Sequence, residues 1–222
     1  WIGITYSIKV FWAPIVDRVP LPFLTRCLGR RRGWMLLAMM GIAAGLLGMA
    51  GTEPSSDLSR LALCALLVAF SSATQDISID AYRIEAVSHE LQGAMAATYQ
   101  LGYRMALLVA GGGALLLADA VNWSITYVFL SSLTIIGIAT VLVIDEPETS
   151  EVLAPPVGGI KDWVSIALVN PFIDFFSRNG RFALVVLLFI GLFRISDLLM
   201  GVMANPFYID IGFSLTEIGL II

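Results

Sequence analysis

Long apolar runs, each close to the thickness of a bilayer, are the feature that most constrains this chain. Residues 34–50 and 124–144 contain no charged side chain, and residues 60–86, 94–118 and 181–203 contain only a few. Apolar segments of about 17–25 residues cross the roughly 30 Å hydrocarbon core as helices. Helices satisfy their own backbone hydrogen bonds there, which irregular chain cannot do. We therefore predict an all-α membrane protein with spans near these five ranges and no strands.

Composition agrees with membrane insertion. The 222-residue chain is 58% hydrophobic and 14% charged, whereas soluble domains carry about 25% charged residues. Its only arginine cluster lies between two apolar segments, so we expect no nucleic-acid surface. Cys27 and Cys64 are expected near opposite membrane faces and should not form a disulfide. With one histidine and no HExxH motif, the sequence predicts no metal site, no cofactor and no enzyme activity.

Basic residues alternate between loops and predict the orientation. The loop Asp17–Gly33 holds five arginines, and a later turn holds Arg83 and His89. The long polar region 145–180 holds Lys161 and Arg178, with Arg181 directly after it. The intervening loops are mostly acidic or neutral. The positive-inside rule places the basic loops in the cytoplasm.

One predicted helix carries an ionic face. In Ser71–Glu85, Asp76, Asp80 and Arg83 fall within an arc of roughly 60° at 100° per residue. A charge facing lipid costs at least ~2.5–3.5 kcal/mol, so this face must line a wet cavity or meet other charges. Such a face is typical of a transport pathway.

The estimated depths of the charges suggest compensation across a cavity. Counting ~1.5 Å per residue from the cytoplasmic helix ends, Asp76 and Arg104 lie roughly 15 Å deep, and Lys9 and Asp80 roughly 10 Å deep. Opposite charges at equal depth on different helices suggest pairing. The uncharged spans 34–50 and 124–144 are expected at the lipid-facing periphery.

Several motifs resemble a known family. Asp17-Arg18 followed by Gly29-Arg30-Arg31-Arg32 resembles the loop signature between helices 2 and 3 of the major facilitator superfamily, although Val19–Leu28 separates its two parts here. The stretches ATQDISIDAYRIE, DRVPLPFLTRCLGRRRGW and NPFYIDIGFSLTEIG together look like the AmpG-type muropeptide permeases, and related acetyl-coenzyme A transporters share parts of the pattern. The resemblance covers nearly the whole chain.

This resemblance implies twelve or more helices in two halves that alternate access to a central site. It implies proton-coupled import of anhydro-muropeptides across the bacterial inner membrane by a multi-pass monomer, with the solute, protons and the lipid bilayer as partners. The chain opens and closes inside apolar segments and lacks an initiator Met, so we interpret it as an internal fragment, from helix 2 to the start of helix 8, that cannot transport alone. Residues 1–144 would belong to the N-terminal half, 145–180 to a cytoplasmic linker with an amphipathic helix, and 181–222 to the C-terminal half.

The candidate residues form two groups. The proton-coupling or substrate group is Lys9, Gln75, Asp76, Asp80, Tyr99, Tyr103, Arg104, Arg194 and Asp197. The gating or signature-loop group is Asp17, Arg18, Gly29, Arg30, Arg31, Arg32, Arg83 and Glu85.

Each assignment has a structural alternative. Asp76 and Asp80 could belong to an ion-pair network with Lys9, Arg83 and Arg104, and Arg194 with Asp197 could form a local i, i+3 salt bridge. Tyr99 and Tyr103 could stack on sugar faces or simply pack in the core. Glycines at 41 and 45, and at 111–113, indicate close helix packing.

Three other functions stay open at this point. The chain could transport another anionic solute such as acetyl-coenzyme A. It could be a membrane-embedded enzyme, which the lack of clustered histidine ligands disfavours. It could be a receptor that no longer transports, which charges at mid-depth disfavour.

Overall fold

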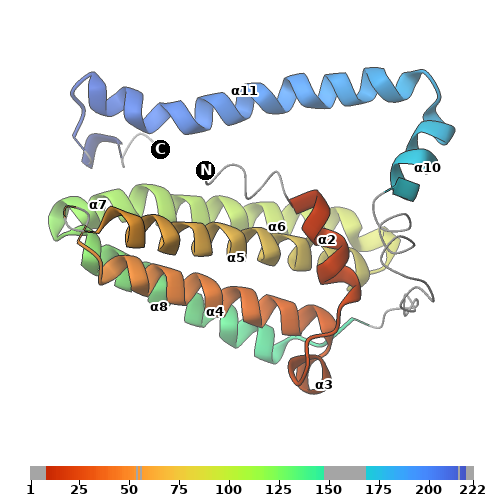
Figure 1. Ribbon diagram of the computed structural model, residues 1–222, viewed down its shortest axis with the longest axis horizontal. Coiled ribbons are helices and arrows are strands. Elements are labelled where there is room, and N and C mark those ends of the chain that lie inside the picture. The colour runs from red at the N-terminus through yellow and green to blue at the C-terminus, as the bar shows by residue number, and fades with distance from the viewer. Residues whose placement is uncertain (1–8, 54, 56, 148–168, 215, 219–222) are drawn as a thin grey trace. The chain divides into compact units, whose positions relative to one another are not determined.

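A computed structural model describes residues 9–53, 55, 57–147, 169–214 and 216–218. The chain divides into two compact units, residues 1–153 and residues 154–221 (Figure 1). In the first unit the elements are α2 (Lys9–Arg18), α3 (Leu24–Leu28), α4 (Arg30–Ala50), α5 (Leu58–Glu85), η1 (His89–Leu91), α6 (Gln92–Leu107), η2 (Leu108–Gly113), α7 (Ala114–Ala120) and α8 (Trp123–Val143). In the second they are α10 (Asn170–Asn179) and α11 (Phe182–Asp210).

The membrane-length helices confirm the all-α prediction. Arg30–Ala50, Leu58–Glu85, His89–Ala120 and Trp123–Val143 are each long and apolar enough to cross a membrane. A fifth span is reached if the bent pair Ile173–Asn179 and Phe182–Phe193 counts as one. The described residues contain no strand. Four observed spans match the predicted ranges in the first unit to within a few residues.

Capping side chains mark where two of these spans begin, and a run of glycines lies within a third. The Asp57 carboxylate accepts a hydrogen bond from the Arg60 amide, and the Asn122 side chain accepts one from the Ile125 amide. Both satisfy an amide that the helix itself leaves unpaired. In the span His89–Ala120, the predicted glycine cluster 111–113 lies in the π-helical turn η2, which joins α6 to α7 without ending the helix.

Glycines let α4 approach α5 closely. A Cβ on Gly45 would lie 2.6 Å from Val68 Cγ2, and one on Gly48 would lie 2.6 Å from Cys64 Sγ, while Gly41 faces Ser71. These glycines share one face of α4. Because they have no side chain, α4 and α5 can approach each other closely there. The predicted packing role of Gly41 and Gly45 is therefore confirmed.

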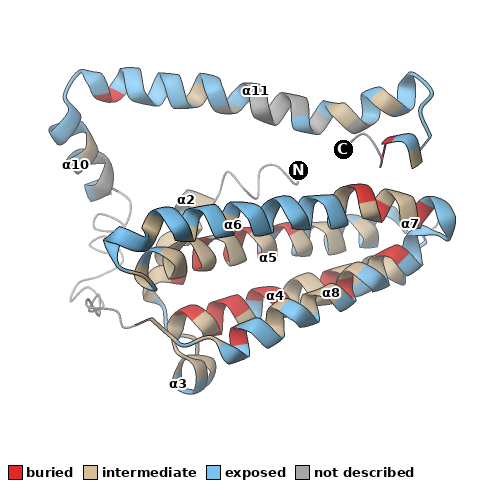
Figure 2. Ribbon diagram, turned by 180° about the vertical axis from the view of Figure 1, so that it is seen from behind, coloured by how far each residue is buried: buried red, intermediate tan, exposed pale blue. Residues whose placement is uncertain are grey.

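The expected lipid-facing position of both uncharged spans holds only in part. The described residues of α8 are mostly exposed, but α4 lies between α5 and α8 and buries more residues than its neighbours (Figure 2). Only one stripe of α4 is open, carrying Leu37, Met40 and Leu47. A helix without charges can contact lipid on every side. The small residues of α4 also allow close packing against other helices, and α5 and α8 cover two of its faces.

Three segments differ from the predicted boundaries. The predicted loop Asp17–Gly33 begins inside α2, which continues to Arg18, and it contains the short helix α3. The predicted span 181–203 ends too early, because α11 continues to Asp210 with Pro206 inside the helix. A proline removes one backbone hydrogen bond, yet membrane helices tolerate it because neighbouring groups can satisfy the freed carbonyl.

The first described helix of the second unit is one that the sequence predicted only loosely. The aromatic-rich region 145–180 contains α10, whereas residues 148–168 of that region lie outside the described part. After α11, Ser214 and Glu217 form a capping box: Glu217 accepts from the Ser214 amide at 2.9 Å, and the Glu217 amide donates to Ser214 Oγ at 3.3 Å. Residues 216–218 are helical, so a further helix starts at this capping box.

Candidate functional site

An ion pair joins α2 to α5. Lys9 Nζ donates to Asp76 Oδ2 at 3.3 Å, and the two side chains are 29% and 41% exposed. Asp76 lies on the helix face that the sequence marked as ionic. Equal depth favoured Arg104 as the partner of Asp76, and that pairing is wrong; the structure pairs Asp76 with Lys9, which the alternative of an ion-pair network had included. Our estimate placed Lys9 and Asp76 at different depths, and the long lysine side chain is able to span that difference.

An aromatic side chain forms a second contact between the same helices. Trp12 follows Lys9 by three residues and therefore shares its helix face; its Nε1 donates to Thr74 Oγ1 at 3.0 Å. The indole also packs against Phe70 and Trp34, with ring centroids 5.0 and 6.0 Å away. The Lys9–Asp76 pair thus stands beside a packed aromatic cluster that fixes the spacing of α2 and α5.

The next acid along α5 is paired within its own helix. Asp80 meets Arg83 at 3.4 Å, and the Arg83 guanidinium lies 4.8 Å from the centre of the Tyr99 ring on α6. Arg83 therefore connects a carboxylate of α5 to an aromatic ring of the next span. Lys9, expected near Asp80 by depth, is instead the partner of Asp76.

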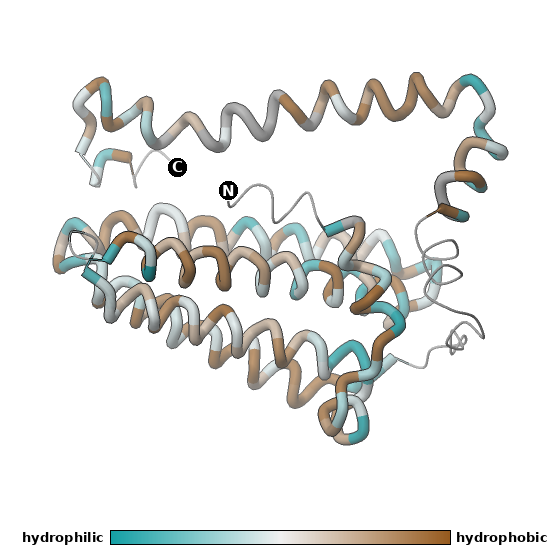
Figure 3. Tube along the Cα trace, viewed as in Figure 1, coloured by the Kyte–Doolittle hydropathy of each residue, from teal (hydrophilic) through white to brown (hydrophobic). Residues whose placement is uncertain are grey.

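Arg31 joins three helices at one end of the first unit. Its side chain is only 6% exposed; Nη1 donates to Asp17 at the end of α2, and Nε and Nη2 donate to Glu85 at the end of α5. The distances are 2.5 Å to Asp17 and 3.0 and 2.5 Å to Glu85. Every acid of α5 therefore has a basic partner, and Figure 3 shows the hydrophilic positions of α5 toward its C-terminal end.

Glu146 ties the end of α8 to the start of α4. Its carboxylate accepts from the backbone amides of Arg31 at 2.7 Å and Arg32 at 3.1 Å, so it caps the N-terminus of α4. In return, the Arg32 side chain donates to the carbonyls of Val141 and Leu142 at the C-terminus of α8. Each group is opposite in sign to the helix end that it meets. We call Asp17, Arg31, Arg32, Glu85 and Glu146 the Arg31 cluster.

Gly29 makes room for this arrangement. Its φ of +91° lies where residues with a side chain are strained, and a Cβ would lie 2.6 Å from Glu146 Oε2. A side chain at position 29 of the signature loop would therefore overlap Glu146, which explains why glycine is suited to this position.

The remaining predicted site residues do not join these ion pairs among the described side chains. Gln75 is partly buried on α5; Tyr103 and Arg104 are exposed on α6, and Arg104 forms no ion pair with a described residue. Arg18 and Arg30 are partly buried near the Arg31 cluster without a described ion pair. Arg194 and Asp197 lie in α11, but their side chains are outside the described part of the structure.

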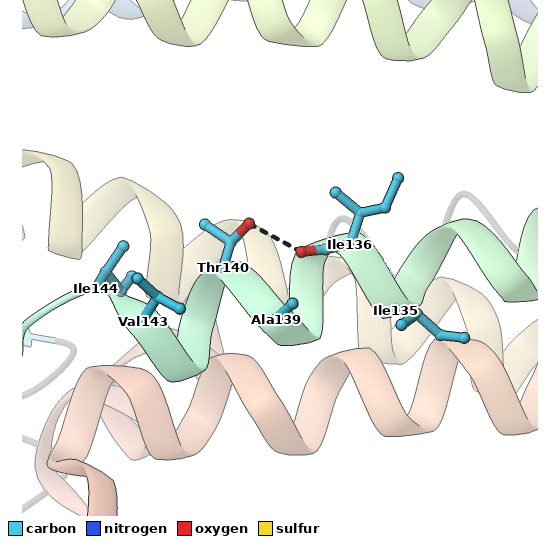
Figure 4. A pocket seen from close by; sticks show the side chains of 6 residues that line it. All are labelled: Ile135, Ile136, Ala139, Thr140, Val143 and Ile144. Carbon is cyan, nitrogen blue, oxygen red and sulfur yellow. Dashed lines mark hydrogen bonds between the residues drawn. The ribbon is translucent and has the colours of Figure 1, made fainter.

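One groove on the first unit lies away from these charges. One groove of about 540 Å³ lies along α8 and is lined by Ile135, Ile136, Ala139, Thr140, Val143 and Ile144 (Figure 4). Its one hydroxyl, on Thr140, donates to the Ile136 carbonyl of the same helix at 2.8 Å. The rest of the lining is apolar, which suits contact with hydrocarbon better than recognition of a polar solute.

Sequence reasoning missed three contributors: Trp12, Thr74 and Glu146. Trp12 could have been found from its i, i+3 spacing to Lys9. Glu146 directly follows an uncharged span, and its partners are more than a hundred residues away in sequence, so no local signal connects them.

Comparison with known proteins agrees with the helices and the loop signature. The family model described as Major Facilitator Superfamily matches residues 2–222. The chain is 36% identical over 222 residues to the anhydromuropeptide permease of Escherichia coli, covering 99% of this chain and 43% of that protein. It is 35% identical over 220 residues to a Rickettsia conorii protein designated AmpG 4, covering 98% and 52%.

The chain thus spans about half the length of the curated relatives that it matches. A third relative, from Haemophilus influenzae and uncharacterised, is 32% identical over 219 residues and covers 98% and 49%. The helical spans, the Arg31 cluster in the loop signature and the family match over nearly every residue lead to one conclusion: the chain belongs to the major facilitator superfamily.

Proposed function

We propose that the complete gene product imports anhydro-muropeptides across the bacterial inner membrane and couples this import to protons. Membership of the superfamily and the similarity to an anhydromuropeptide permease support the transporter class and the cargo. The observation that carries the mechanism is the Lys9–Asp76 pair, which joins two helices inside a membrane-length bundle.

The pair offers a physical reason for coupling. While Asp76 is ionised, it neutralises Lys9; once Asp76 takes a proton, Lys9 is an uncompensated cation within the bundle. A lone charge at membrane depth costs at least ~2.5–3.5 kcal/mol. An anionic solute can compensate Lys9 in place of Asp76. Binding of a proton and binding of an anionic solute therefore favour each other, as symport requires.

The other polar side chains of the predicted substrate group suit the proposed cargo. Peptide and lactyl carboxylates match the bidentate guanidinium of Arg104, which is exposed and free of described ion pairs. Tyr99 and Tyr103 stand near it on α6 and could stack on sugar faces. Gln75, Asp80, Arg194 and Asp197 complete the proposed substrate group.

The Arg31 cluster is proposed to act at the cytoplasmic end. It ties the ends of α2, α4, α5 and α8 together, which favours movement of this group of helices as one body. Arg18, Arg30 and Arg83 lie toward the same end and are proposed to contribute to the gate.

The test is uptake by cells that lack their own muropeptide permease and express the complete gene. We expect accumulation of labelled anhydro-muropeptide that a protonophore abolishes, and no accumulation of labelled acetyl-coenzyme A in vesicles from the same cells. Accumulation that survives the protonophore would contradict the coupling, and uptake of acetyl-coenzyme A instead would contradict the cargo.

A further inference from the structure

Six consecutive apolar residues, Val19–Leu24, lead from α2 into α3 outside the membrane-length helices. We call them the apolar run. Four of them, Val19, Pro20, Pro22 and Phe23, are exposed, and Phe23 reaches 78%. A run of exposed apolar residues is unfavourable in water and is typical of a surface that meets another apolar surface.

The backbone holds Phe23 in a strained turn. The Leu24 amide donates to the Pro22 carbonyl at 2.9 Å, which closes a γ-turn around Phe23, with φ 73° and ψ −55°. Residues with a side chain seldom adopt this turn, and it persists only where the surroundings hold it. Thr25 holds it here: Oγ1 accepts from the Leu21 amide at 2.8 Å, and the Thr25 amide donates to the Leu21 carbonyl at 3.1 Å. The outward position of the Phe23 ring is therefore fixed by the fold.

The helix α3 packs on the same face of α4 as the open stripe of that helix. A Cβ on Gly33 would lie 3.4 Å from Leu24 Cβ, so Gly33 is where α3 rests on α4. By helical spacing, Gly33 falls within an arc of about 80° that also holds three exposed residues of α4, namely Leu37, Met40 and Leu47. Figures 1 and 2 both show α3 beyond α4 on the side away from α5. The segment therefore continues the open stripe of α4 at the end of the helix.

The level of α3 along the membrane normal follows from α4. The 21 residues of α4 extend over about 31 Å, close to the roughly 30 Å thickness of the hydrocarbon core. Since α3 ends at Leu28 and α4 begins at Arg30, α3 stands at the level of the phospholipid headgroups when α4 crosses the bilayer. The positive-inside rule makes this the cytoplasmic leaflet.

We propose that the apolar run and α3 form a contact with the phospholipids of the cytoplasmic leaflet, with the Phe23 ring at the boundary between headgroups and hydrocarbon. Arg26 and Cys27 follow Phe23 by three and four residues, so they lie on the same side of α3, and both are exposed. Arg26 forms no ion pair with a described residue, and its guanidinium is placed to meet phosphate oxygens. The proposal depends on membrane insertion of α4 and not on the cargo or on proton coupling.

The test measures the depth of fluorescent labels in the complete gene product. In one variant Cys64 and any further cysteine are replaced by Ala, so that native Cys27 carries the label; in a second, Cys27 is also replaced and Phe23→Cys carries it. The protein is reconstituted in vesicles of phosphatidylethanolamine with phosphatidylglycerol. The quenchers are phosphatidylcholine with a nitroxide either near the headgroup or near the chain end, and iodide in the water. A label at Met40 gives the lipid reference, and one at Glu90 gives the aqueous reference.

Labels at positions 23 and 27 should be quenched more strongly by the nitroxide near the headgroup than by the one near the chain end, and the order should reverse at Met40, which lies in the middle of α4. Iodide should lose most of the effect that it has at Glu90. Iodide quenching as strong as at Glu90, with no effect of either lipid nitroxide, would overturn the proposal, because α3 would then lie in water. Labels shielded from lipid and water alike would also overturn it, since the apolar run would then be packed on protein. The label on Cys27 leaves the apolar run unchanged, so it carries the test alone if the variant at position 23 folds poorly.

Discussion

Replacing Gly29 by alanine should destabilise the protein by about 2–4 kcal/mol, because two independent costs add at this position. The first is backbone strain: at φ +91° and ψ 173° an alanine pays about 1–3 kcal/mol. The second is displacement of Glu146, since the new Cβ would overlap its carboxylate. Moving Glu146 breaks its hydrogen bonds to the amides of Arg31 and Arg32, and loss of a helix cap costs about 0.5–2 kcal/mol.

The same helix offers a matched control at its other end. Gly51 has φ −89°, and a Cβ there would meet only the Leu47 carbonyl at 3.7 Å, an ordinary contact. Gly51→Ala should therefore change the free energy of unfolding by no more than about 0.5 kcal/mol. Equilibrium unfolding of the complete gene product in mixed detergent micelles measures both variants under identical conditions.

A double-mutant cycle separates the two costs. In a Glu146→Ala background the cap is already lost and the steric overlap is relieved, so Gly29→Ala should cost only the backbone strain. The two substitutions should therefore be coupled by about 1–2 kcal/mol. Equal effects of Gly29→Ala and Gly51→Ala would refute the assigned conformation, and full additivity with Glu146→Ala would refute the contact.

Three further substitutions test the packing and the ionic contacts by the same unfolding measurement. Arg31→Lys should cost about 1–3 kcal/mol, because one ammonium cannot bridge Asp17 and Glu85 as the guanidinium does; an unchanged stability would contradict the bridging role. Trp12→Phe keeps an aromatic ring but removes the donor to Thr74 and should cost about 1 kcal/mol; a second substitution, Thr74→Val, should add little to it if the two groups are partners. Gly45→Ala should cost about 1–3 kcal/mol, since its Cβ would lie 2.6 Å from Val68, and a stabilising effect would show that α4 and α5 are not in close contact.

The membrane spans were predictable because a segment in lipid must satisfy its own backbone hydrogen bonds. An apolar run of sufficient length must be helical, and polar residues such as Asp57 and Asn122 mark where it starts. The end of α11 was not predictable in this way. Asn205 and Pro206 read as loop residues by local propensity, whereas the helix continues to Asp210.

The sequence named the members of these ion pairs as one alternative, but helical depth did not give the correct pairs. Position along a helix gives the depth of a side chain, and it identified Asp76 and Asp80. Depth does not say which helix lies beside α5 or how that helix is rotated. The structure pairs Asp76 with Lys9 on α2, and Asp80 with Arg83 one turn away. Glu146 acts on α4 across more than a hundred residues, and only the fold brings the two together.

The most direct test of the account compares Asp76→Asn with Asp80→Asn in the complete gene product. Both changes keep the shape of the side chain and remove its titration, on the same helix and one turn apart. The account predicts that Asp76→Asn abolishes uptake of labelled anhydro-muropeptide driven by a proton gradient while exchange of labelled for unlabelled solute persists at normal protein level. Asp80→Asn should keep gradient-driven uptake. Normal gradient-driven uptake by Asp76→Asn, or a loss of folded protein with coupling intact in what remains, would contradict the assignment of Asp76 as the coupling acid.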